Sequence, residues 1–170
     1  IDQHGQLVTQ RTHGALVQVI PHYQVQPAWL SLHFPDGLSL AGPLTLGEAV
    51  VTQIWGRYVR GRVVHGAWDQ ALSDVCGEAV RLVRSDEPGQ CYDEYPVSLL
   101  WQASLAYLSQ QGGETVPFDS RRFRPNFLVS GCTPHQEDEW HGGVIQIGAE
   151  ARLRVMARDP RCAIITLDPT

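Results

Sequence analysis

The sequence predicts a mainly β protein with a few short helices, an α+β chain in two parts. Three observations predict this class. Short apolar and β-branched runs alternate with turn residues through the first half, a helical pattern interrupts them, and the last third returns to short apolar runs. Closely spaced strands with short turns are typical of a sandwich or a small barrel. We place the boundary in the polar loop 85–94, and we expect domains at 1–90 and 91–170.

The first half contains the clearest strand patterns. The run 29–34 is followed by the turn residues Pro35-Asp36-Gly37 and by a returning run at 38–40, which together predict a hairpin. Further strands of this half are expected at 7–10, 15–20, 49–54, 58–64 and 79–83.

Two helices are expected. Apolar residues at Trp68, Ala71, Leu72 and Val75 have the spacing of one helix face, and Gly77 is well placed to end that helix. A second helix is expected at 103–110. The remaining strands are predicted at 96–100, 127–129, 144–147, 151–156 and 162–167. The segment 163–167 is expected to be buried, because it begins with a continuous apolar run.

Composition excludes several kinds of function. The 170 residues include 43% hydrophobic and 18% charged residues, as in ordinary globular chains. The 13 basic residues are all arginine, so these residues contain no phosphate-binding loop lysine and no Schiff-base lysine. The net charge of −5 makes the chain a poor candidate for nucleic-acid binding, which needs a broad basic surface.

Cysteine usage and the absence of long apolar runs indicate the compartment. No two cysteines form a C-x-x-C pair, so we expect four reduced thiols in an intracellular protein, at Cys76, Cys91, Cys132 and Cys162. No apolar run approaches the roughly 20 residues of a membrane span. The chain starts at Ile1 without an initiator methionine, and we expect it to be truncated at both ends.

Three segments carry candidate functional residues. The cluster Arg121-Arg122-Phe123-Arg124-Pro125-Asn126 is suited to clamping a phosphate, although a solvated loop is the alternative on composition alone. The run 135–141, with two histidines and three acids, is either a divalent-metal site or a surface loop. Cys162 beside Arg161 is either a reactive or metal-binding thiolate or a small buried apolar residue.

Several motifs in the same order resemble the MOSC superfamily, whose domains are named after the C-terminal part of molybdenum cofactor sulfurase. The motifs lie at 96–100, 102–106, 122–126, 137–140, 147–148 and 161–169, and the hairpin 2–11 is similar to the MOSC N-terminal β-barrel domain. Within this superfamily, the motifs resemble those of the mitochondrial amidoxime-reducing component and its bacterial homologues. This resemblance implies a MOSC β-barrel, incomplete at the C-terminus, preceded by an N-terminal β-barrel-like domain. Relatives usually have Ser or Thr at Trp101, so the second helix is expected to lack its usual N-cap.

The resemblance also implies roles for individual residues. Cys162 matches the cysteine whose thiolate ligates molybdenum, and a soft thiolate suits that metal. The other matching positions are cofactor-binding and belong to a molybdenum–pterin cofactor site: Arg11, Glu94, Tyr95, Arg124, Asn126, Arg161 and Asp168. Asp168 is expected to support its loop.

The function implied by this resemblance is that of a molybdenum-dependent oxidoreductase that reduces N-hydroxylated small molecules. Electrons would come from a partner redox protein carrying a flavin, a b-type cytochrome haem or an iron–sulfur cluster, because the chain has no such motif of its own. A bacterial source would imply a cytoplasmic location. One alternative is a sulfur carrier that holds a persulfide on Cys162 for metal–sulfur cofactor assembly. Another is a non-enzymatic, truncated binding module.

Overall fold

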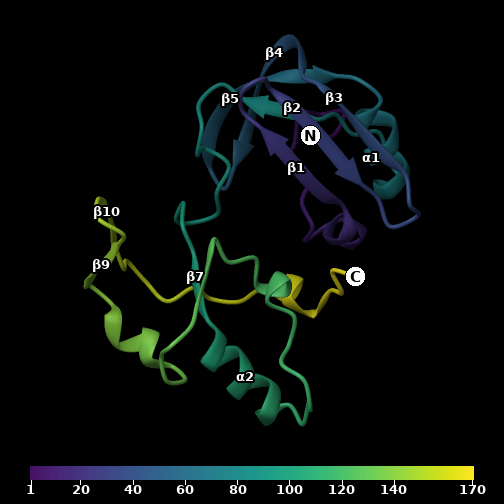
Figure 1. The fold of residues 1–170 in the computed structure, drawn as a ribbon. Coiled ribbons are helices and arrows are strands. Elements are labelled where there is room, and N and C mark those ends of the chain that lie inside the picture. The colour runs from purple at the N-terminus through teal and green to yellow at the C-terminus, as the bar shows by residue number, and fades with distance from the viewer. The chain divides into compact units, whose positions relative to one another are not determined.

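A computed structural model describes all residues 1–170. The chain divides into two compact units, called unit 1 and unit 2 here (Figure 1). Unit 1 comprises Ile1–Pro96 and Leu167–Thr170, and unit 2 comprises Val97–Thr166.

Unit 1 contains two antiparallel sheets of three strands each (Figure 1). The first sheet has the order β1 (Ile20–Gln24), β2 (Trp29–His33) and β3 (Ser39–Pro43), after the short 3-10 helix η1 (Gly14–Gln18). β1 is an edge strand, and all of its residues are exposed. The second sheet has the order β4 (Thr45–Ile54), β5 (Arg57–His65) and β6 (Val83–Ser85).

The predicted hairpin at the β2–β3 turn is confirmed. Gly37 has a φ of +89°, which glycine adopts without a steric penalty, and its N–H donates to the carbonyl of Phe34 over 3.0 Å. The Asp36 carboxylate accepts a hydrogen bond from the Leu38 N–H over 2.9 Å. This side-chain contact to the backbone two residues on is the reason aspartate favours such turns.

The helix α1 (Trp68–Cys76) has the bounds that its apolar spacing predicts. Gly77 ends it in the left-handed region at φ +71°, and its N–H donates to the Ser73 carbonyl over 2.8 Å. The buried face of α1 packs on the first sheet. The core of unit 1 consists of Leu30, Leu32, Phe34, Val64, Trp68 and Ala71.

Unit 2 is built around one parallel strand pair. β7 (Leu99–Trp101) pairs with β8 (Phe127–Val129), and α2 (Gln102–Gln111) begins directly after β7. Trp101 occupies the N-cap position and makes no capping hydrogen bond, as the sequence predicts. A second, antiparallel pair consists of β9 (Val144–Ile147) and β10 (Ala151–Arg154). Neither α-helix is long and apolar enough to cross a membrane.

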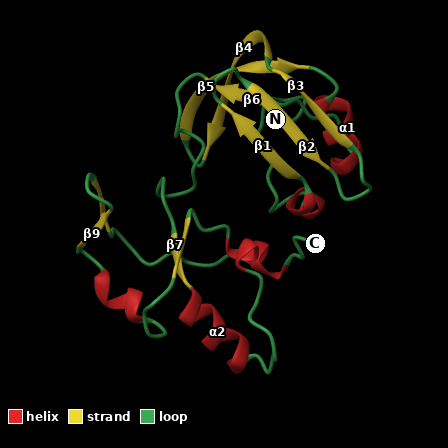
Figure 2. Cartoon of the chain, in the orientation of Figure 1, coloured by secondary structure: helices red, strands yellow, loops and turns green.

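Three short 3-10 helices complete unit 2, and strands β8, β9 and β10 lie between them in the sequence (Figure 2). They are η2 (Ser120–Phe123), η3 (Gln136–Trp140) and η4 (Ala163–Thr166). The strand predicted at 162–167 is therefore wrong: the segment forms η4, and no residue of it is buried. A short apolar run has no periodicity that separates strand from helix, and this one has no neighbouring strand to pair with.

Smaller differences occur near the N-terminus. Residues 7–10 form no strand, and most of the expected strand at 15–20 is the 3-10 helix η1. Of the expected strand at 79–83, only Val83 belongs to β6, while Val80 makes an isolated bridge to Asp2.

The mainly β class with short helices is confirmed, and all four cysteines are free thiols, as expected. The expected β-barrels are not present, because the four sheets have two or three strands each and remain open. Barrel closure requires both edges of a sheet to find a partner. Here the edge strand β1 pairs only with β2, and β6 pairs with β5 over three residues.

Candidate functional site

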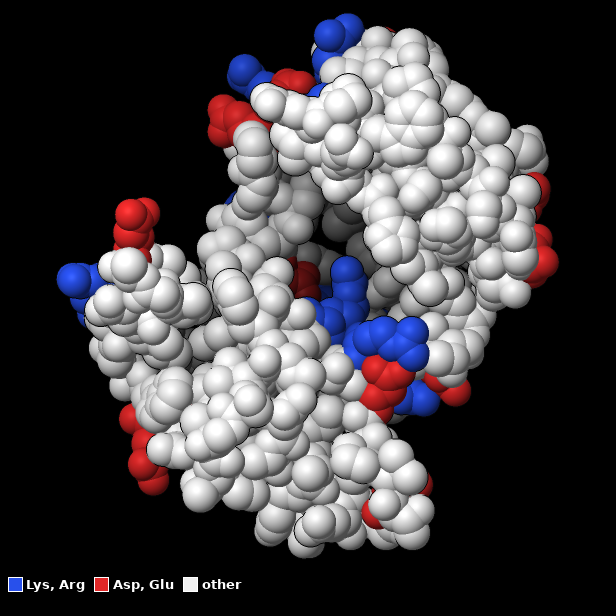
Figure 3. Space-filling view, in the orientation of Figure 1, with Lys and Arg blue, Asp and Glu red and all other residues white.

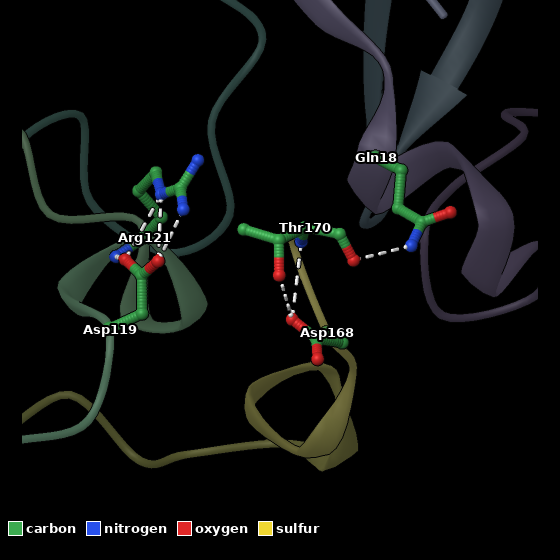
Figure 4. Close-up of polar contacts among 5 residues, drawn as sticks. All are labelled: Gln18, Asp119, Arg121, Asp168 and Thr170. Atoms are coloured by element: carbon green, nitrogen blue, oxygen red, sulfur yellow. Dashed lines mark hydrogen bonds and ion pairs between the residues drawn. The ribbon is translucent and has the colours of Figure 1, made fainter. Parts of the chain in front are cut away.

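The arginine cluster of unit 2 is organised by Asp119, which precedes η2. Its carboxylate accepts a hydrogen bond from the backbone N–H of Arg121 over 2.9 Å. The guanidinium of Arg121 also donates to this carboxylate, with Nε 2.9 Å from Oδ2 (Figure 4). The side-chain hydrogen bonds from Arg121 hold the pKa of Asp119 below its usual value. Arg121 therefore has a local structural role within the cluster.

Arg124 and Asn126 lie between η2 and β8. Arg124 ends η2 in the left-handed region at φ +51°, and its N–H donates to the Arg121 carbonyl over 3.1 Å. The Asn126 side-chain Oδ1 accepts the Ser98 backbone N–H over 2.8 Å, and the Asn126 backbone N–H donates to the Ser98 carbonyl over 3.0 Å. Asn126 thus closes the start of the β7–β8 pair, and only its side-chain amide nitrogen remains to donate to a ligand.

Arg161 and Cys162 lead into η4, which packs against η2 within unit 2. The Arg161 guanidinium lies 5.4 Å from the centre of the Phe123 ring and donates to the Asp159 carboxylate over 2.8 Å. Cys162 is exposed. The structure therefore brings the predicted thiol segment next to the predicted arginine turn, although they are about forty residues apart in sequence.

The predicted residues of unit 1 lie in two places. Arg11 donates to the Asp93 carboxylate over 2.7 Å, so it lies against the loop that carries Glu94 and Tyr95. Glu94 and Tyr95 are both exposed. Asp168 lies near the C-terminus, where its carboxylate accepts the N–H and the hydroxyl of Thr170 over 3.1 and 2.9 Å (Figure 4).

Thr170, which Asp168 contacts, is also held from η1. The Thr170 carbonyl is in turn held by Gln18 Nε2 over 2.9 Å, which ties the last residues to the end of η1 (Figure 4). Across both units, arginines lie in small groups beside acidic side chains (Figure 3).

The histidine-rich run 135–141 serves packing in this structure. The His135 ring meets the Tyr107 ring edge-on at 5.2 Å, and the backbone N–H of His135 donates to the buried Ser104 hydroxyl over 2.9 Å. Trp140 meets Trp101 edge-on at 4.9 Å. No three or more His, Cys, Asp or Glu side chains converge as a metal-binding group.

A cavity of about 220 Å³ lies in unit 1 between η1, the β4–β5 sheet and α1. Its lining is mostly aliphatic and includes Cys76 and Cys91. Burial raises the pKa of the Cys76 thiol, which favours its neutral form. None of the predicted site residues lines this cavity.

Four residues near Arg11 were not predicted from the sequence. The guanidinium of Arg11 lies 4.4 Å from the Trp55 ring, and that of Arg57 lies 3.9 Å from the Tyr92 ring. Asp93 completes the group through its ion pair with Arg11. The Trp55-Gly56 dipeptide marks a turn in the sequence, but no local pattern predicts which distant arginine lies on the tryptophan.

The fold and site define a small β-rich domain with an exposed cysteine beside an arginine-rich turn. Comparison with protein families gives a match to the MOSC domain over residues 61–170, which begins within β5 and includes all of unit 2 up to Thr166. The chain therefore belongs to the MOSC domain family, and it is related to the mitochondrial amidoxime-reducing components.

Individual relatives agree with this assignment. The chain is 39% identical to human mitochondrial amidoxime-reducing component 1 over 189 aligned residues, which cover 99% of this chain and 55% of the relative. It is 38% identical to bovine mitochondrial amidoxime reducing component 2 over 74 residues, which cover 44% of this chain and 20% of the relative. A rice molybdenum cofactor sulfurase is 41% identical over 54 residues, 32% of this chain and 6% of that protein. The chain thus spans at most about half the length of these relatives.

Proposed function

We propose that this chain belongs to a molybdenum-cofactor oxidoreductase that reduces N-hydroxylated small molecules such as amidoximes. The observation that carries the proposal is the exposed Cys162 thiol directly before η4, with η4 packed against the arginine-rich η2. Membership of the MOSC family and the relation to amidoxime-reducing components support the same reaction class.

The residues present fit a molybdenum–pterin cofactor. A thiolate is a suitable soft ligand for molybdenum, and Cys162 is accessible to it. Guanidinium groups bind anionic oxygens through paired N–H donors, a role that we assign to Arg124 and Arg161. The side-chain amide of Asn126 supplies a neutral donor. When bound, the cofactor supplies the redox chemistry.

The chain's own residues would hold and orient this group. Arg161 is prearranged by Phe123 and Asp159, which lowers the entropic cost of using it as a ligand. In unit 1, Arg11 and the Glu94–Tyr95 loop are the residues that we assign to cofactor binding. Asp168 is assigned to the support of its own loop through Thr170.

The reaction needs an electron source outside this chain. Reduction of an amidoxime to an amidine consumes two electrons and two protons and releases water. We assign the electrons to a partner redox protein with a flavin, a b-type cytochrome haem or an iron–sulfur centre. For a bacterial source, we propose a cytoplasmic location.

The test uses the full-length protein expressed in a host that makes the cofactor. We expect stoichiometric molybdenum and amidoxime reduction in the wild-type protein. Cys162→Ser replaces a soft thiolate with a hard hydroxyl, so it should abolish reduction while pterin content is retained. Arg124→Ala should lower cofactor affinity about tenfold to hundredfold, since a charge-assisted hydrogen bond contributes roughly 1.5–3 kcal/mol. Wild-type cofactor content and activity in both variants would refute the site.

A second candidate function is favoured by the same exposed thiol and by the similarity to a molybdenum cofactor sulfurase. In it, Cys162 carries sulfur as a persulfide for cofactor assembly. That function predicts persulfide labelling of the wild-type protein, its loss in Cys162→Ser, and no need for bound molybdenum.

A further inference from the structure

The turn between β4 and β5 has an unusual composition for its geometry. Ile54 pairs with Arg57, so Trp55 and Gly56 form a two-residue hairpin turn, with φ values of +48° and +83°. Such a turn needs positive φ at both positions, and Asn-Gly is the usual pair. A bulky side chain is disfavoured there, because its Cβ approaches the backbone. The geometry of the turn therefore does not explain why position 55 is tryptophan.

The Trp55 ring does have a partner in the N-terminal segment. The Arg11 guanidinium lies 4.4 Å from the ring centre, in a cation–π contact. Arg11 also donates to the Asp93 carboxylate over 2.7 Å. Trp55 is half exposed, so its placement in the turn does not serve burial in the core. It provides an aromatic surface against which the Arg11 guanidinium lies.

Arg57, on the other side of the same turn, holds the preceding loop residue. Its guanidinium lies 3.9 Å from the Tyr92 ring centre, and one of its terminal N–H groups donates to the Tyr92 carbonyl. The Arg57 Nε is buried without a hydrogen-bond partner, which is energetically unfavourable. The turn thus holds Tyr92 directly through Arg57, and Asp93 indirectly through Trp55 and Arg11.

We propose that the β4–β5 turn is a positioning element for the residues of unit 1 that we assign to cofactor binding. Trp55 fixes the orientation of Arg11, and Arg57 fixes the loop that continues into Glu94 and Tyr95. Both are positioning residues and do not themselves contact the ligand. The inference rests on the proposed function, in which Arg11 and this loop bind the molybdenum–pterin cofactor.

The sharpest test is Trp55→Gly in the full-length protein, compared with Trp55→Tyr. Glycine suits the positive φ of this position, so the turn loses its strain and the thermal unfolding midpoint should stay equal or rise. The aromatic platform is lost, so pterin should dissociate about twofold to fivefold faster, as expected for the loss of one exposed cation–π contact. Trp55→Tyr keeps a ring and should restore the wild-type rate.

Amide hydrogen exchange of residues 91–95 gives a readout that does not depend on the cofactor. We expect faster exchange in Arg57→Gln, which keeps a hydrogen-bond donor and loses the charge. Unchanged pterin dissociation in Trp55→Gly, or unchanged exchange in Arg57→Gln, would overturn the proposal while leaving the proposed function intact. A wild-type protein that contains no pterin would overturn both.

Discussion

At the scale of single residues, several arginine and asparagine side chains of the predicted site already have partners within the protein. Arg121 is bound by Asp119, and Arg161 is oriented by Asp159 and Phe123. The side-chain Oδ1 of Asn126 accepts a hydrogen bond from the Ser98 N–H. A residue that a sequence motif marks as a ligand can therefore also serve the fold, and the two roles need different substitutions to separate them.

Asn126 offers such a separation. Asn126→Ala removes the acceptor for the Ser98 N–H and should lower the free energy of unfolding by about 0.5–1.5 kcal/mol, the usual net value of one hydrogen bond. Asn126→Asp keeps that acceptor and loses the amide donors, so it should retain stability and bind less cofactor. Urea unfolding and pterin content measure the two effects. Equal stability of the alanine and aspartate variants would contradict a stabilising role for the hydrogen bond between Ser98 N–H and Asn126 Oδ1.

Asp119 predicts a pH dependence of stability. Its pKa in the folded state is lowered by Arg121, so its contribution is present above the pKa of the unfolded chain, about 3.9, and is lost as the pH falls through the folded value. Asp119→Asn keeps an acceptor for the Arg121 N–H and removes the charge. We expect it to cost about 0.2–1 kcal/mol at pH 7 and nothing at a pH below both pKa values.

Chemical denaturation of the wild type and Asp119→Asn between pH 2 and pH 7 measures this difference. A gap between the two proteins that stays constant down to the lowest pH would contradict an electrostatic origin.

At the scale of the elements, steric contact between neighbouring strands makes one glycine essential. A Cβ on Gly61 of β5 would lie 2.5 Å from the Arg84 carbonyl oxygen of β6 and 2.8 Å from Val83 Cγ1. Gly61→Ala must therefore separate β5 from β6, and it should destabilise the protein by about 1–3 kcal/mol.

Gly42→Ala in β3 is the matched control for this substitution. Its Cβ would meet only Trp68 ring atoms, at 3.7 Å, which is ordinary contact. Thermal unfolding of both variants should show a clear loss for Gly61→Ala and little change for Gly42→Ala. Similar midpoints in the two variants would show that the β5–β6 contact is not limiting.

The elements that could be predicted from the sequence are those whose signals are local. The apolar spacing of α1 and the glycine that ends it lie within ten residues, and the turn residues of the β2–β3 hairpin are contiguous. The 3-10 helix η4 could not be predicted, because Ile164 and Ile165 are compatible with strand or helix and only missing strand partners decide between them.

The candidate site shows the same limit. Arg124, Arg161 and Cys162 can be recognised as parts of motifs in the sequence. The packing of η2 on η4 could not be predicted from the sequence, because it is known only from the fold. The contacts of Arg11 with Trp55 and Asp93 join segments about 40 and 80 residues apart, and no pattern within either segment encodes the partner.

At the scale of the whole molecule, buried apolar side chains are unequally distributed. Unit 1 contains the six-residue core around Trp68, whereas the buried apolar residues of unit 2 are Leu100, Trp101 and Leu105. Because the hydrophobic effect is the main source of stability, local opening is expected to be easier in unit 2.

Native-state hydrogen exchange tests this difference. We expect the slowest amides at Val63 and Val64, which are both 2% exposed, and much faster exchange in η2, η3 and η4. Exchange in the 3-10 helices as slow as that of β5 would contradict the expected order.

The edge strand β1 has a consequence for how copies of this chain behave at high concentration. An exposed edge offers its unpaired N–H and carbonyl groups to any other extended segment, and pairing there is the first step of β-aggregation. Pro21 stands in this strand, opposite Leu32, and has no N–H to offer. If a strand of another molecule paired with β1, the hydrogen bond at Pro21 would be missing. One carbonyl of the incoming strand would then have no donor. A single imino acid on the outer edge thus discourages the sheet from growing beyond β1.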